Sequence, residues 1–172
     1  MSVLARDEEQ GEEPDDGAPI EVLEAYFEAR GWTCERSGDG EIVASAPGSW
    51  AQYELRGVWR PEDGVLQFLA FPDVKVSAEK KNAIYETLGL VNEQLWLGHF
   101  ELWSNSGLIV FRYAALMNAD EDALSFEQAE AISEAALEEC ERFYPVFQFV
   151  LWGGKSPSEA ITAALIETAG EA

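Results

Sequence analysis

Apolar and polar residues alternate along several stretches of the chain, and this alternation predicts β-strands. In residues 51–60 every second position is apolar or glycine, which is typical of a strand with one buried and one solvated face. Residues 65–71 are apolar on both faces, which favours a central strand, and Pro72 is expected to end or bulge it. Further strands are expected at 32–36, 41–46, 99–103 and 108–116.

Apolar residues spaced three and four positions apart predict helices before and between these strands. The first helix is expected to begin near Pro19 and to end at Gly31. A second helix is expected from about Ala78 to Leu95.

The C-terminal third of the chain also has a helical pattern. Ser125 and Gln128 form the sequence signature of a capping box, and one apolar stripe follows it, made of Ala129, Ile132, Ala136, Cys140, Phe143 and Phe147. Pro145 is expected to kink this helix or to start a new one. Gly153-Gly154 should end it, and Ser156 should cap a last helix.

The strands at 99–103 and 108–116 flank a Ser-Asn-Ser-Gly turn and are expected to form a hairpin. If Trp103 pairs with Leu108, then Phe100 faces Phe111 on one side of the hairpin. The register is therefore consistent with one buried face.

Trp103, Leu108 and Val110 then lie together on the opposite side of the hairpin. Trp50 similarly falls on the solvated face of its strand. Exposed apolar residues that cluster can mark a surface for a partner, so these four residues are a candidate partner surface. The alternative is that a helix, a loop or a second subunit shields them.

The order of elements predicts the fold class: a helix, three or four strands, a helix, two strands, and one or two helices. Strands joined by hairpins imply an antiparallel sheet, so we expect an α+β fold with five to six strands and the helices packed on one face. Residues 1–17 contain seven acidic residues and one basic residue, and should be a disordered acidic tail. Residues 18–172 are expected to form a single domain.

The charge of the chain narrows the classes of function. The formal net charge is −22, which argues against binding to a nucleic-acid backbone or to an anionic membrane surface. The N-terminus lacks the pattern of a signal peptide, and the apolar runs are shorter than the roughly 20 residues of a membrane span. We therefore expect a cytoplasmic protein.

No group of residues indicates catalysis, and we expect no enzyme activity, no cofactor and no metal. His99 is the one histidine and has no cysteine nearby. Cys34 and Cys140 are expected to be buried free thiols. Residues 153–156 resemble the end of a phosphate-binding loop but lack its first glycine. Residues 120–122 are acidic but do not complete a calcium-binding loop.

Two stretches of the chain, residues 91–103 and 141–157, resemble the YbjN domain family, and the layout from about residue 19 to 170 is similar as well. The resemblance implies a fold akin to type III secretion chaperones, with the order α-β-β-β-α-β-β-α. It also implies a suspected role in regulating bacterial sensory transduction. It offers no catalytic residues.

Together these observations predict a non-enzymatic module that binds or regulates a protein partner, with chaperone-like activity by analogy of fold. The partner is unidentified, and whether the chain forms a homodimer is left open. The alternative is an acidic decoy that mimics nucleic acid and occupies the site of a basic protein.

Overall fold

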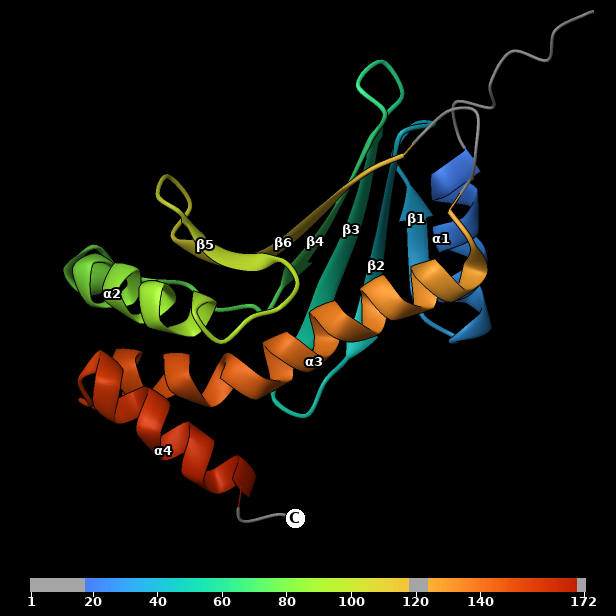
Figure 1. The fold of residues 1–172 in the computed structure, drawn as a ribbon. Helices are drawn as coiled ribbons and strands as arrows, with labels where there is room; N and C mark the ends of the chain where they lie inside the picture. The colour runs from blue at the N-terminus through green and yellow to red at the C-terminus, as the bar shows by residue number, and fades with distance from the viewer. Residues whose placement is uncertain (1–17, 118–123, 170–172) are drawn as a thin grey trace, which may run out of the picture.

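The computed structural model describes residues 18–117 and 124–169. In this part of the chain, six strands form one antiparallel sheet with the order β1-β2-β3-β4-β6-β5 (Figure 1). The strands are β1 (Thr33–Arg36), β2 (Glu41–Pro47), β3 (Gln52–Arg60), β4 (Val65–Phe71), β5 (His99–Trp103) and β6 (Leu108–Leu116). The helices are α1 (Ala18–Ala29), α2 (Lys81–Asn92), preceded by the short η1 (Ala78–Lys80), α3 (Phe126–Leu151) and α4 (Pro157–Ala169).

The α+β fold class predicted from the sequence is confirmed. Four strands precede α2 and two helices follow β6, so the described chain has one strand and one helix more than the order α-β-β-β-α-β-β-α. The expected disordered tail 1–17 and the acidic stretch 118–123 lie outside the described residues.

The strand patterns have the predicted consequences. In β3, Tyr53, Leu55 and Gly57 are buried, while Gln52 and Glu54 are exposed. Strand β4 lies between β3 and β6, so it has a neighbour on both sides, and most of its residues are buried whichever face they are on.

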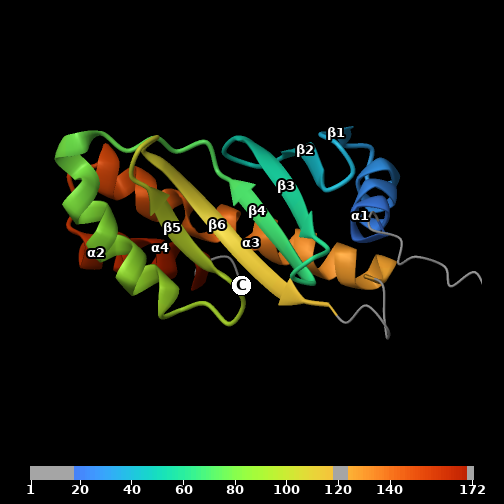
Figure 2. The ribbon, with the colours of Figure 1, turned by 90° about the horizontal axis from the view of Figure 1, so that it is seen from above.

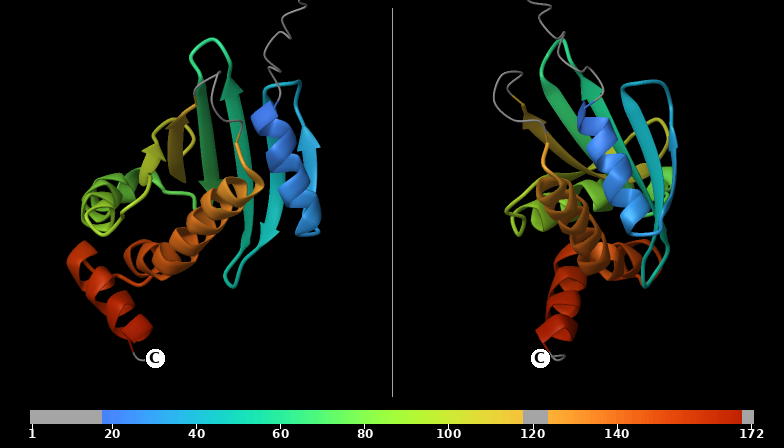
Figure 3. Two further views of the ribbon diagram at one scale, coloured as in Figure 1. Left: turned by 45° about the vertical axis from the view of Figure 1, so that its right-hand side comes forward. Right: turned by 90° about the vertical axis from the view of Figure 1, so that its right-hand side faces the viewer.

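Helices α1 and α3 cover one face of the sheet (Figures 2 and 3). Their apolar stripes contact the inward residues of the strands, and the fully buried aromatic side chains of this core are Tyr26, Phe27, Tyr53, Phe68, Phe100, Phe111, Phe143 and Phe147. Helix α4 packs against α2 and α3 rather than against the strands.

The capping box of α3 is present: the Ser125 hydroxyl accepts from the Gln128 N–H at 3.0 Å, and the Gln128 side chain accepts from the Ser125 N–H at 2.9 Å. The predicted stripe is buried along its whole length. Pro145 does not start a new helix, because α3 runs through it to Leu151. The side chains around Pro145, including Tyr144 and Val146, are buried, so tertiary packing stabilises this turn despite the missing N–H.

Helix α2 ends at Asn92, three residues before the predicted end at Leu95. The Asn92 side chain turns to β5, where its Nδ2 donates to the Phe100 carbonyl at 3.0 Å and its Oδ1 accepts from the Phe100 N–H at 2.8 Å. Asn92 therefore pairs with the edge of β5 in the place where another strand would bind.

Replacing Asn92 by alanine should lower the free energy of unfolding by about 1–3 kcal/mol, because the Phe100 N–H and C=O lose their partners beside a buried side chain. Urea denaturation of Asn92→Ala measures the loss. Asn82→Ala is the matched control, since Asn82 is an exposed asparagine of the same helix. Equal effects of the two substitutions would contradict the role given to Asn92.

Candidate functional site

The face of the sheet opposite α1 and α3 carries a second, smaller apolar cluster. Leu69, Phe71 and Val110 are buried there, and Trp103 and Leu108 are half-buried and pack against them. The Trp103 and Phe71 rings meet edge to face, with 5.3 Å between their centroids. We call these five residues the open-face cluster, because within the described residues they pack only with strand neighbours and under no helix.

The register of the strands explains how this cluster forms. Trp103 pairs with Leu108, and Phe100 pairs with Phe111, as the sequence predicted. The strands β4 and β6 then bring Leu69 and Phe71 beside Val110. These side chains alternate along the strands with core residues, so they point to the other face.

Three of the four residues of the predicted partner surface therefore lie together: Trp103, Leu108 and Val110. Val110 is 0% exposed, so it forms the floor of the cluster and offers no surface of its own. That these residues bind a partner stays a prediction. The sequence did not indicate that Phe71 belongs to this cluster, because its contact with residues of β6 depends on the order of the strands.

The placement of Trp50 on a strand was wrong. Strand β2 ends at Pro47 and β3 begins at Gln52, so Trp50 lies in the connecting loop. Trp50 is 52% exposed, and its ring stacks on Tyr144 of α3, with 6.1 Å between centroids and 5° between planes. The Ser49 N–H donates to Glu141 of α3 at 2.6 Å, which holds the loop on the helix and keeps Trp50 away from the open-face cluster.

Charged side chains border the cluster on β3. The Arg56 guanidinium lies over the Phe71 ring, 5.2 Å from its centroid. Arg56 Nη2 is 2.7 Å from Glu54 Oε1, and Arg56 Nε is 3.4 Å from Glu41 Oε1. Two carboxylates of its own chain therefore neutralise this arginine.

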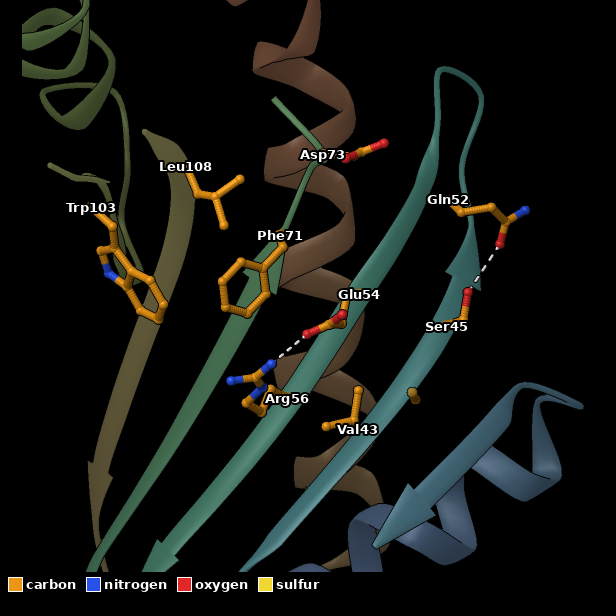
Figure 4. Close-up of a pocket in the computed structure, with 10 residues that line it drawn as sticks. Val43, Ser45, Gln52, Glu54, Arg56, Phe71, Asp73, Trp103 and Leu108 are labelled. Carbon is orange, nitrogen blue, oxygen red and sulfur yellow. Dashed lines mark hydrogen bonds and ion pairs between the residues drawn. The ribbon is translucent and has the colours of Figure 1, made fainter. Parts of the chain in front are cut away.

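An open groove of about 510 Å³ runs across this face, between the cluster and strand β2 (Figure 4). Phe71, Trp103 and Leu108 line one side. The other side and the floor come from β2, β3 and the end of β4, through Val43, Ala44, Ser45, Gln52, Glu54, Arg56 and Asp73. The groove thus has an apolar wall and a polar wall.

Asp73 follows Pro72 at the end of β4 and has a backbone φ of +60°, in the left-handed region that aspartate adopts more readily than most residues. Its side chain is exposed at one end of the groove. Burial, and to a smaller degree the negative charge of Asp73, raises the pKa of Tyr144. The sequence predicted only that the strand ends here, and gave no signal for the position of this carboxylate.

The other candidate residues have structural roles or stand apart. His99 is exposed, with its Nε2 3.9 Å from a Glu101 carboxylate oxygen. Cys140 is buried as expected, but Cys34 is only half-buried because β1 is an edge strand, and both are free thiols. Ser156 caps α4 and bonds reciprocally with Glu159, and no strand precedes it as a phosphate-binding loop requires.

The described ranges contain no group of three or more residues arranged to bind a metal ion. The acidic residues 120–122 lie outside these ranges. None of the described helices combines the length and the apolar character that crossing a membrane requires.

The model of the YbjN family, with the description "Putative bacterial sensory transduction regulator", matches residues 19–149. The fold is also similar to a solved structure, described as "Crystal structure of YbjN, a putative transcription regulator from E. coli". The two chains are 10% identical, the TM-score is 0.50, and the similarity covers 77% of this chain and 88% of that one. Comparison with curated proteins gives no match.

Proposed function

Because the chain belongs to the YbjN family, which is described as regulatory, we propose that it is a non-enzymatic regulatory module that acts by binding a protein partner on the open face of its sheet. The observation that supports this proposal is the open-face cluster with its groove. A strand face that only contacts water is normally polar, and apolar patches that remain accessible are typical of interaction surfaces.

Replacing Trp103 by serine should remove most of the binding to the partner, since a tryptophan at the centre of an interface commonly contributes about 2 kcal/mol or more, which is more than tenfold in affinity. The full chain carries an affinity tag, and mass spectrometry identifies the proteins retained from a lysate of the source organism. The candidate partners are the proteins that the wild-type chain retains and the Trp103→Ser variant does not.

Trp96→Ser is the matched control, because Trp96 is fully exposed and lies outside the groove. Circular dichroism of both variants checks that they fold. Loss of the same proteins by both variants, or by neither, would contradict the proposal. A change in oligomeric state of Trp103→Ser alone, measured by light scattering, would instead identify a second copy as the occupant of the face.

The exposed carboxylates of α3 support the alternative of an acidic decoy. Glu127, Glu130 and Glu138 are exposed on the side of the helix that faces away from the sheet. A basic partner bound there should dissociate steeply as salt rises and should be indifferent to Trp103→Ser. Binding on the open face should persist at high salt, because apolar contacts contribute most of it.

A further inference from the structure

We propose that the segment bound in the groove is amphipathic and basic: it places large apolar side chains on the wall of Phe71, Trp103 and Leu108, and an arginine or lysine against Glu54 and Asp73. This inference rests on the proposed function and specifies the chemistry of the partner at that site.

The apolar wall defines one half of the segment. Trp103 and Leu108 are half-buried, so part of each side chain remains accessible, while Leu69 and Val110 are buried beneath them in the open-face cluster. Figure 4 shows the Trp103 ring, the Phe71 ring and the Leu108 side chain along the same side of the groove. The volume of about 510 Å³ is within the range of about 300–1,000 Å³ of ordinary ligand pockets, which suits a few side chains of one segment.

The charges on the polar wall define the other half. Arg56 is the one basic residue that lines the groove. Glu54 and Glu41 share it, so these three groups keep one net negative charge on the polar wall. Asp73 has no ion pair within the described residues, and its carboxylate remains available at the end of the groove. A cation from the partner would balance it, and would be attracted further by the net charge of −22.

The groove already contains an example of this chemistry within the chain. The Arg56 guanidinium combines an aromatic face, Phe71, with a carboxylate, Glu54. An arginine of the partner would find the same pair of groups between the apolar wall and Asp73. Lys75 pairs with Leu108 in an isolated antiparallel bridge and is not among the residues that line the groove, so Asp73 is the expected contact for the basic side chain of the partner.

A second copy of the chain fits this face less well than a basic segment. Each copy has 33 acidic against 11 basic residues, so two copies repel each other as they approach. The two groove-lining carboxylates would have to find cations on the same face of a second copy, where Arg56 is already paired with Glu54.

The test uses three short synthetic peptides with a fluorescent label, and fluorescence anisotropy with the full-length protein. One alternates leucine with arginine, the second leucine with glutamate, and the third serine with arginine. We expect the leucine–arginine peptide to bind most tightly, because it alone satisfies both walls. Equal binding of the leucine–glutamate peptide, or of the serine–arginine peptide, would overturn the inference.

Two double variants locate the binding. Glu54→Gln with Asp73→Asn should weaken the leucine–arginine peptide about three- to tenfold, the loss expected for two partly exposed ion pairs. Asparagine tolerates the left-handed backbone at position 73, so the fold is retained. Glu79→Gln with Glu93→Gln removes two exposed carboxylates outside the groove and should leave the affinity unchanged.

Equal weakening by both double variants would mean that the peptide responds only to overall charge, and would overturn the inference. The proposed function would survive that result if Trp103→Ser still lost its protein partner while Trp96→Ser kept it. If Trp103→Ser kept its partner, the proposed function itself would be wrong.

Discussion

Phe100→Ala is expected to lower the free energy of unfolding by about 3–5 kcal/mol, the usual cost of removing a buried phenylalanine side chain. Phe100 is 2% exposed and lies where the sheet meets α3. Its ring contacts Phe111 on β6 and both Phe143 and Phe147 on α3, with centroid distances of 5.4, 6.0 and 5.5 Å. The sheet and α3 are both rigid, so we expect them to move little into the space left by the Phe100 ring, and a cavity to remain there.

Urea denaturation measures this loss, with Trp96→Ala as control, since that side chain is fully exposed and its removal leaves no cavity. We expect the control to stay within about 0.5 kcal/mol of wild type. A loss below about 1.5 kcal/mol for Phe100→Ala would mean that the aromatic contacts between the sheet and α3 rearrange readily.

Gly98→Ala should destabilise the protein by about 2–5 kcal/mol, because a backbone penalty and an overlap of atoms act together. Gly98 has a φ of +70°, which disfavours any side chain. An added Cβ would lie 2.5 Å from Cζ of buried Phe111 and 2.7 Å from the Arg112 carbonyl oxygen. The carbonyl belongs to the paired strand β6, so it cannot move without breaking the sheet.

Gly89→Ala makes the same chemical change with the opposite expected sign. Gly89 lies within α2, and nothing is within 4 Å of the position that its Cβ would take. Alanine should therefore stabilise the protein by about 0.5–1 kcal/mol through its helix propensity. Thermal unfolding of both variants gives the comparison. A Gly98→Ala protein that is as stable as Gly89→Ala would contradict the tight site at Gly98.

Local patterns predicted the fold well where one residue interacts with near neighbours in sequence. The hairpin register of Trp103 and Leu108 and the capping boxes at Ser125 and Ser156 depend on side chains within a few residues of each other. The alternation of β3 and the apolar run of β4 likewise fixed which faces are buried.

The parts that sequence reasoning missed depend on contacts between distant segments. Trp50 was placed on a strand because the alternation of apolar residues extends to position 51, but the bond from Ser49 to Glu141 joins residues 92 positions apart. Asn92 ends α2 early through its bonds to Phe100. The polar wall of the groove could not be predicted, because its residues come together only through the order of the strands, which no local pattern contains.

The pairing of Asn92 with Phe100 also limits how readily the sheet can add a further strand. A sheet with an apolar open face is prone to add strands at its edges and to grow into aggregates. At one edge, α2 lies along β5 and Asn92 occupies the backbone groups of Phe100. At the other, β1 is only four residues long and exposes Glu35 and Arg36. Neither edge offers a long template, so the open face can stay apolar without recruiting further copies into a fibril.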